Sequence, residues 1–340
     1  MTKHPEVFIV SSGRAGSTLL QSLLNATGQI YIPQESDFIA RAYPFFYKKE
    51  KFYHEDYKKI ASIFRITSQD KGWGMDESHI VEHLKQHNPQ TLANVFSEIC
   101  ELLHSRMGTR DLMWGIKRPV LIANIDRILS TYPNAKIVHI YRDGRDVFLS
   151  YKSIHDSSPI KFGPKGIFTN ALYWIDGLRR VEEFRNSTKE EKSKRHVFEI
   201  KYEEIITNPE HTLKQLCSFI EIDYDPLIIE NFYKEDVQKR VAPRDLMSSI
   251  HAKLSGKLDL NNVGKYLKKM NKREVFFYEL LASPYLEKYG YEVKYSVASS
   301  NLFRPFRRLS YYVARQINDI RYERRDKRVF DCVSKSSNTQ

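Results

Sequence analysis

The sequence predicts an α/β protein in which a central parallel sheet is covered by helices on both faces. Short apolar runs with β-branched residues, typical of buried strands, stand at 7–12 and 135–141, and HVFEIKY at 196–202 is a third strand. Each run is followed by residues with helical spacing, and strands that alternate with helices form parallel sheets. The 340 residues are 41% apolar and 28% charged, which is the balance of a globular protein.

In the first half of the chain, the sequence predicts two strands and most of the helical insertions. The strand at 7–12 precedes a helix at 19–26, and residues 35–110 have a mostly helical pattern. Their aromatic stretches, such as FFYKKEKFYHEDYKK, are expected mainly to pack a core. In the alternative, they line a groove that binds a ligand. A short strand at 113–116 leads into an amphipathic helix at 120–132.

In the second half, the pattern predicts two further strands between helices. The strand at 135–141 runs into a helix that begins with RDGRDVFLSYKS. Helices at 167–185 and 209–221 flank the strand at 196–202. A helix at 274–292 closes the domain, so the chain is expected to form a three-layer α/β/α structure.

A glycine-rich turn, SSGRAGST at 11–18, joins the first strand to the first helix. Amides at a helix N-terminus are unpaired and lie at the positive end of the helix dipole, so they favour an anion. Gly13 and Gly16 supply backbone freedom, and Ser17 and Thr18 supply hydroxyls. The ATP-binding motif GxxxxGK(S/T) is absent because no lysine precedes Ser17. The turn therefore indicates an anion site, although an ordinary strand–helix turn with a Ser/Thr cap has the same pattern.

A second motif follows the strand at 135–141. It places Arg142 at the carboxyl end of that strand and Ser150 eight residues later. Ligands of open parallel sheets bind at this end, and an arginine can hold a phosphate with forked hydrogen bonds. In the alternative, Arg142 and Arg145 simply pair with the aspartates of a surface turn.

Together the two motifs resemble those of the PAPS-dependent sulfotransferases. In that family (K/R)SGT(T/S)L binds the 5′-phosphosulfate of 3′-phosphoadenylyl sulfate (PAPS), and RD-x-R-x-x-x-x-S binds the 3′-phosphate. Here the motifs read RAGSTL and RDGRDVFLS. The resemblance covers the chain from about residue 5 to about residue 292, and is closer to the tyrosylprotein and carbohydrate branch than to the cytosolic enzymes. It implies a P-loop-like fold and PAPS as co-substrate, bound by Ser12, Gly13, Arg14, Ala15, Gly16, Ser17, Thr18, Arg142 and Ser150.

Other segments extend this resemblance. IYIPQESDF places Glu35 where the branch has its catalytic base, and GIKRP places Lys117 in the Lys-x-Pro segment. KYEEI implies that Tyr202 lies near the adenine. NNVGKYLKK resembles the late loop that closes over the cofactor, so Lys265 and Tyr266 are expected to contact nucleotide phosphate. The chain departs from the family in Ala15, which replaces a common serine, and in Tyr266, which replaces a tryptophan.

The resemblance implies sulfuryl transfer to an acceptor hydroxyl by in-line attack, with no metal. Glu35 would take the acceptor proton. Arg14 and Lys117 would stabilise the negative charge that develops on the leaving phosphate. The histidine base of the cytosolic branch is absent, which leaves His155 and His251 as alternative bases. In the alternative, structural roles, Glu35 would begin the helix that follows it and Lys117 would pair with a nearby carboxylate.

The expected acceptor is a carbohydrate or glycolipid, bound beside the helical block at 36–110 and the loop at 154–166. Two other function classes stay open. A P-loop kinase-like phosphotransferase is disfavoured by the absent lysine and by the lack of an acidic magnesium site. A non-catalytic protein that binds an anionic polymer would use the basic tail. No RNA-type aromatic motif occurs, so no nucleic-acid partner is expected.

Half of the net charge of +12 comes from residues 301–340, which hold ten Lys or Arg and four Asp or Glu. We expect a sulfotransferase domain at 1–295 and a basic, partly helical extension at 296–340. The extension has apolar residues near helical spacing between arginines. Such a helix can lie on an anionic membrane surface or dock on its own domain.

The sequence favours a cytoplasmic protein, with peripheral membrane contact through this extension as one of the two alternatives. The three cysteines are far apart and form no CxxC pair, as expected in a reducing compartment. No apolar run is long enough to span a bilayer, and MTKHPEVFIV lacks the features of a signal peptide.

Overall fold

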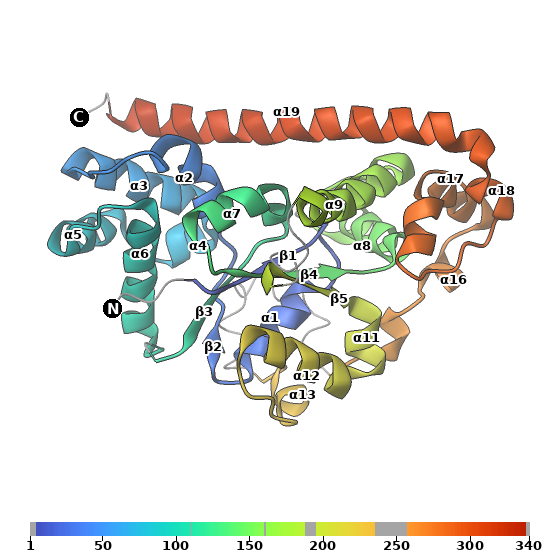
Figure 1. The fold of residues 1–340 in the computed structure, drawn as a ribbon, viewed down its shortest axis with the longest axis horizontal. Coiled ribbons are helices and arrows are strands. Elements are labelled where there is room, and N and C mark those ends of the chain that lie inside the picture. The colour runs from blue at the N-terminus through green and yellow to red at the C-terminus, as the bar shows by residue number, and fades with distance from the viewer. Residues whose placement is uncertain (1–4, 110, 160, 188–194, 235–256, 338–340) are drawn as a thin grey trace.

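A five-stranded sheet forms the middle of the computed structural model, with helices above and below it (Figure 1). Every pairing is parallel, and the order is β2-β3-β1-β4-β5, which confirms the predicted parallel sheet. The structure describes residues 5–109, 111–159, 161–187, 195–234 and 257–337. The strands are β1 (Val7–Val10), β2 (Ile30–Tyr31), β3 (Met113–Lys117), β4 (Lys136–Tyr141) and β5 (Val197–Lys201).

The central strand β1 is buried on both faces. Phe8 and Val10 pack into the hydrophobic cluster on one face of the sheet, and Val7 and Ile9 pack into the cluster on the other. All four side chains are fully buried. Alternate residues of a strand point to opposite faces, so a continuous apolar run is the pattern of a strand between two helical layers.

Three groups of helices pack around the sheet. One face carries α1 (Ser17–Asn25), α11 (Tyr202–Thr207), α12 (Pro209–Ile220) and α13 (Ile228–Asn231). The other face carries α2 (Phe38–Phe46), α3 (His54–Thr67), α4 (Gln69–Trp73), α5 (Glu77–His87), α6 (Leu92–Met107) and α7 (Ile125–Thr131). A third cluster joins α8 (Gly144–Ser157), α9 (Ile167–Ser187), α16 (Tyr266–Lys269) and α17 (Lys272–Lys288), and α18 (Ser296–Ser299) packs against α17.

Two of the differences from the predicted elements concern β2 and the helix predicted at 120–132. Strand β2 was not predicted, because two residues are too few to show a strand period; it pairs with β3 at the edge of the sheet. The helix predicted at 120–132 is divided into a 3-10 helix, η1 (Pro119–Asn124), and α7. Asn124 has a φ of −136°, outside the helical range, and separates the two.

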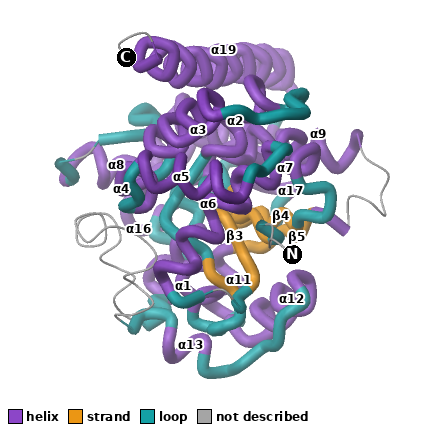
Figure 2. Tube along the Cα trace, turned by 90° about the vertical axis from the view of Figure 1, so that its left-hand side faces the viewer, coloured by secondary structure: helices purple, strands orange, loops and turns teal. Residues whose placement is uncertain are grey.

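The C-terminal extension forms one long helix, α19 (Arg304–Ser337), after a short 3-10 helix, η4 (Asn301–Phe303). In Figure 1 it runs along the upper edge of the molecule, and Figure 2 shows it above α2 and α3. It docks on the chain's own domain, as one of the two alternatives proposed. The ion pairs that hold it are Arg41–Asp326 at 2.5 Å, Arg325–Asp37 at 3.1 Å, Arg180–Asp319 at 2.6 Å and Arg315–Asp176 at 2.8 Å. None of the described helices combines the length and the apolar character needed to cross a bilayer.

Candidate active site

The predicted site residues follow the carboxyl ends of four neighbouring strands. The glycine-rich loop follows β1, Lys117 ends β3, Arg142 follows β4 and Tyr202 follows β5. Parallel strands end at the same edge of a sheet, so these residues meet there. Since β1 lies between β3 and β4, this edge is also the point where the strand order reverses, which is where open α/β sheets bind ligands.

The loop after β1 has the conformation of an anion cradle. Gly13, Arg14 and Gly16 all have positive φ, at 81°, 55° and 98°. Gly16 is the N-cap residue of α1, and no side chain caps this helix. The alternative interpretation, in which a Ser or Thr caps the turn, therefore does not apply. The first amides of α1 are left to the loop, at the positive end of the helix dipole.

The two predicted binding motifs meet in the structure. The Nε of Arg14 donates a hydrogen bond to the Oγ of Ser150 at 3.1 Å, across 136 residues of chain. Burial lowers the pKa of the Arg14 guanidinium; the hydroxyl of Tyr151 raises it and the positive charge of Arg142 lowers it. Loop and motif thus form one site with clustered positive charge, as binding a single ligand with two anionic ends requires.

Tyr151 belongs to this site, although the sequence did not single it out. A Cβ atom on Gly13 would lie 2.3 Å from its hydroxyl oxygen, so the loop backbone and this ring are in close contact. Burial is the main reason why the pKa of Tyr151 rises to about 12, and Arg14 and a hydrogen bond with Tyr173 act in the opposite direction. The sequence signal that could have indicated Tyr151 is its position directly after Ser150.

Arg142 is held in a buried frame. Its guanidinium lies 4.4 Å from the centre of the Tyr202 ring, and its Nη2 bonds to Asp146 at 3.3 Å and to the carbonyl of Asn262. The side chain is 9% exposed. Within the described part of the chain, its buried Nε has no hydrogen-bond partner. Arg142 therefore keeps a donor for a further group.

Arg145 has a different role from Arg142. Its Nη2 pairs with Asp143 at 2.7 Å and its Nη1 with Glu279 at 2.6 Å, while its guanidinium lies 3.8 Å from the centre of the Tyr266 ring. Both arginines of the turn thus pair with its aspartates, as the alternative interpretation held. The pairs are buried rather than on the surface. Arg145 therefore holds Asp143, Glu279 and Tyr266 together and has a structural role.

The segment NNVGKYLKK, at 261–269, contacts the second motif through Asp146. The 3-10 helix η3 (Leu260–Asn262) and α16 follow one another here. The amide of Tyr266 donates to the Oδ1 of Asp146 at 2.8 Å, and the ammonium of Lys265 contacts the Oδ1 of Asn262. The segment therefore lies beside Arg142, although its predicted phosphate contacts stay predictions. Residues 235–256, which precede this segment, lie outside the described residues.

Glu35 lies between two cations at the end of β3. Lys117 Nζ donates to Glu35 Oε1 at 2.6 Å and to Thr18 Oγ1 at 3.3 Å, and Arg118 binds Glu35 Oε2. Burial alone would raise the pKa of Glu35, but Lys117 and Arg118 lower it to about 2. Burial lowers the pKa of Lys117. Glu35 precedes the Asp37 N-cap of α2, so it does not begin that helix.

This arrangement predicts a pH-dependent stability. The folded-state pKa of Glu35 is below its ordinary value of 4.5, so its contribution is present above pH 4.5 and is lost as the pH falls toward 2. We expect Glu35→Gln to lower the free energy of unfolding at pH 7 by on the order of 3 kcal/mol, with a smaller loss below pH 4. Urea unfolding at several pH values measures this. Glu210→Gln, at an exposed pair with Lys214, should have little effect at any pH. A loss for Glu35→Gln that does not change with pH would contradict the assignment.

The ion pairs of the site continue to α19. Asp37, whose side chain is fully buried, pairs with Arg41 at 2.9 Å and with Arg325 at 3.1 Å. The Nε of Arg118 is 4.0 Å from its Oδ1. A chain of charges therefore links α19 to the cation that holds Glu35.

Comparison with known proteins gives the family. The model of the sulfotransferase family matches residues 5–226. The chain belongs to this family. A curated relative, an uncharacterised protein of Aquifex aeolicus, is 22% identical over 233 residues, 68% of this chain. The chain spans 27% of the length of that relative.

Two solved structures share the fold. The sulfotransferase domain of the Synechococcus PCC 7002 olefin synthase is 16% identical with a TM-score of 0.56, over 86% of this chain and 96% of that one. The sulfotransferase domain of the curacin biosynthetic pathway is 17% identical with a TM-score of 0.57, over 86% and 99%. The P-loop-like α/β fold implied by the motifs is therefore confirmed.

Of the two histidines considered as alternative bases, only His155 is described. It is half-buried on α8, with its Nε2 3.2 Å from the carbonyl oxygen of Gly163. His251 lies outside the described residues. His155 therefore contacts its own loop, whereas Glu35 lies beside Lys117.

A group of potential metal ligands was missed in the sequence. His83 and His87 on α5 and Glu98 on α6 bring their ligand atoms within 4.8 Å of one another. The histidines are one helical turn apart, but Glu98 comes from the next helix, so only folding assembles the group. Its members lie in the helical block and not at the strand ends, and the chemistry proposed below does not use them.

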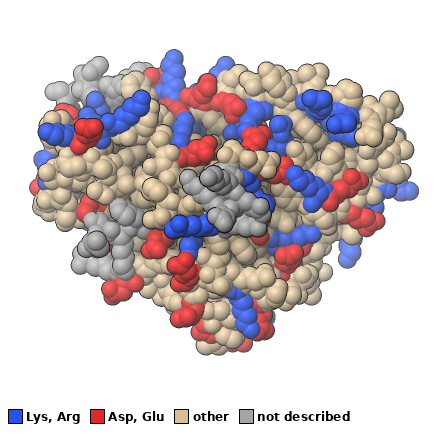
Figure 3. Space-filling model, in the orientation of Figure 1, with Lys and Arg blue, Asp and Glu red and all other residues tan. Residues whose placement is uncertain are grey.

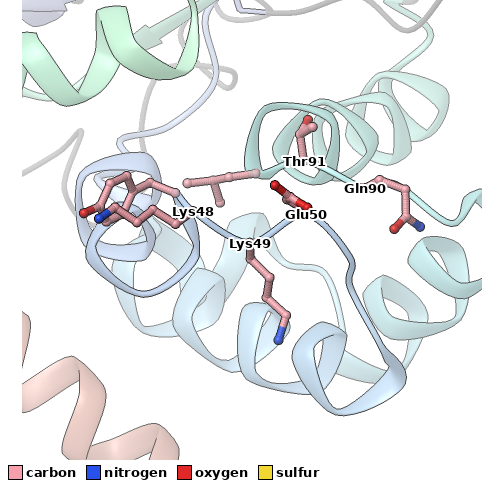
Figure 4. Close-up of a pocket in the computed structure, with 7 residues that line it drawn as sticks. Lys48, Lys49, Glu50, Gln90 and Thr91 are labelled. Atoms are coloured by element: carbon pink, nitrogen blue, oxygen red, sulfur yellow. The ribbon is translucent and has the colours of Figure 1, made fainter.

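A surface hollow of about 690 Å³ lies in the same helical block. Figure 4 shows five of the residues that line it: Lys48, Lys49 and Glu50 after α2, and Gln90 and Thr91 before α6. No predicted cofactor-binding or catalytic residue lines it. The hollow is therefore separate from the candidate site at the strand ends.

Proposed function

We propose that this chain transfers a sulfuryl group from PAPS to an acceptor hydroxyl, on a carbohydrate or glycolipid. The observation that carries the proposal is the meeting of Arg14, Lys117 and Arg142 around an amide-lined loop, with Glu35 as the carboxylate beside Lys117. Clustered positive charge in a buried frame favours a ligand with several negative charges.

The frame fits both ends of such a donor. The loop amides and Lys117 suit the 5′ end. The 3′-phosphate suits Arg142, which keeps a buried Nε, and Ser150, whose hydroxyl already accepts a bond from Arg14. The ring of Tyr202 lies under Arg142 and beside Gly16, at a place where an adenine can stack. Lys265 and Tyr266 would close the same side.

The donor supplies the sulfuryl group and its leaving phosphate. The acceptor oxygen forms a bond to sulfur while the bond from sulfur to the bridging oxygen breaks, and that oxygen keeps the electron pair. Lys117 and Arg14 stabilise the charge on it, and Glu35 accepts the acceptor proton. Their effect is greatest in a dry site, and the Lys117 side chain is only 2% exposed.

Glu35 must lose part of its present pairing to act as a base. Two cations hold its pKa at about 2, where a carboxylate is a weak proton acceptor. We infer that Lys117 turns from Glu35 to the anionic oxygens of the donor, which raises the pKa of Glu35 as the reaction begins. Glu35→Gln should then lower kcat by about 10²–10⁴ and leave nucleotide affinity nearly unchanged.

The donor assignment is tested by calorimetry without magnesium, which a kinase-like phosphotransferase would need. We expect adenosine 3′,5′-bisphosphate to bind far more tightly than AMP. Arg142→Ala should weaken the bisphosphate by about 10–100-fold and Ser150→Ala by less, because the lost bond to arginine is charged. Neither should change AMP affinity.

Two further variants make this test specific. Lys152→Ala removes a partly exposed cation of α8, which pairs with Glu274, and should leave both affinities unchanged. Arg142→Lys keeps the buried charge but loses the forked bonds, so it guards against a folding defect. Equal affinity of the wild-type chain for the bisphosphate and AMP would overturn the proposal.

A further inference from the structure

Helix α19 carries two faces with different surroundings. Its inner face is fixed by Arg307, which donates to the carbonyls of Ala298 and Ser300, and by Asn318, which donates to Asp176 at 2.9 Å. The outer side chains are large, apolar and 44–80% exposed. They are Leu302, just before the helix, and Phe306, Leu309, Tyr312, Val313, Ile317 and Ile320.

These side chains form one continuous ridge. Their spacing of three and four residues places them on one side of a helix, opposite Arg307 and Asn318. One face of α19 therefore contacts the domain, and the opposite face stays exposed. The ion pairs with the domain do not explain why the exposed face is apolar. A contiguous exposed apolar surface of this kind marks a contact with a partner or a membrane.

The charges around the ridge have mostly one sign. The exposed cations of α19 are Arg304, Arg308, Arg321, Arg324, Lys327 and Arg328, and its exposed acids are Glu323 and Asp331. Asp319 and Asp326 pair with arginines of the domain and do not offset these cations. Figure 3 shows mostly uncharged side chains along the right part of the upper rim, where the first half of α19 lies.

We propose that the outer face of α19 binds the surface of an anionic lipid bilayer, with the helix lying in the plane of the interface. An apolar ridge with basic flanks is the pattern of helices that bury their apolar side at the headgroup boundary. A second copy of this chain fits less well. Paired helices match opposite charges beside their apolar seam, and here the two flanks would bring arginines together. The inference is independent of the proposed reaction.

The test is co-sedimentation of the full chain with two kinds of vesicle. One is phosphatidylcholine alone and the other contains about 30% phosphatidylserine. We expect the chain to bind the anionic vesicles, and to bind less at high salt. The double variant Leu309→Glu, Val313→Glu should bind at least about tenfold more weakly, because it places two carboxylates in the apolar ridge.

Matched variants separate the ridge from net charge. Gln86→Glu with Asn186→Glu, at exposed polar positions on α5 and α9, makes the same change in net charge and should keep vesicle binding. The double variant Leu309→Gln, Val313→Gln removes apolar surface without changing the net charge, and it should lose vesicle binding. Equal binding by the wild-type chain and the ridge variants would overturn the proposal. So would a dimer in light scattering that the ridge variants abolish while no vesicle binding is seen.

Discussion

Replacing Lys117 with alanine is expected to lower the rate of sulfuryl transfer by about 10²–10³-fold, the usual loss when one fixed donor to a developing anion is removed. Lys117 is buried and its ammonium is held between Glu35 and Thr18, so its loss removes a fixed cation from the end of β3. The measurement is the single-turnover release of adenosine 3′,5′-bisphosphate from PAPS, with a glycan acceptor found by screening with labelled sulfate. Affinity for the bisphosphate should fall much less, since Arg142 and the loop remain.

The control for this experiment is Lys136→Ala. Lys136 is also a strand lysine, but it begins β4 at the opposite end of the sheet and pairs with Glu221. Its loss should leave the rate unchanged. Lys117→Arg keeps the positive charge but places it on a guanidinium of different shape. Partial activity of this variant would show that the position of the charge matters as well as its sign. A Lys117→Ala chain that folds and still transfers at the wild-type rate would contradict the assigned role.

Gly16→Ala is expected to remove nucleotide binding. The φ of Gly16 is 98°, so any side chain strains the backbone by about 1–2 kcal/mol. The added Cβ would also lie 2.4 Å from the ring of Tyr202, which must then move from under Arg142. A shift of about 1 Å in a positioned group can cost about 100-fold. Calorimetry with adenosine 3′,5′-bisphosphate and a urea unfolding curve measure the two effects.

Gly28→Ala separates backbone strain from the clash. Gly28 has a φ of 67° in the turn after α1, and a Cβ there would have no atom within 4 Å. The two variants should lose similar stability through backbone strain, but only Gly16→Ala should lose binding. If both variants bind the nucleotide normally, the loop does not form the predicted cradle.

Local patterns were sufficient for the scaffold and for the two motifs. A strand buried on both faces is mostly apolar, so β1 and β4 could be predicted from short windows. The glycines of the loop and the eight-residue spacing of Arg142 and Ser150 are also local features. They predicted which residues meet at the strand ends, and the structure brings Arg14 and Ser150 within 3.1 Å.

The sequence could not predict the pairings between distant elements. The roles of Tyr151 and Arg118 depend on which groups they face, and those groups come from segments far away in the chain. The short strand β2 has too few residues for a period. For α19, the spacing predicted an amphipathic helix but not which face would dock.

The sequence by itself therefore determined the parallel α/β scaffold, the family and the glycine-rich loop after β1, because each depends on residue types at fixed short spacing. Only the tertiary structure decided that Glu35 is held by Lys117 and Arg118, and that Asp37 links this site to Arg325 of α19. Ion pairs and hydrogen bonds act over a few ångströms, so their partners are known only once the folded chain has placed them.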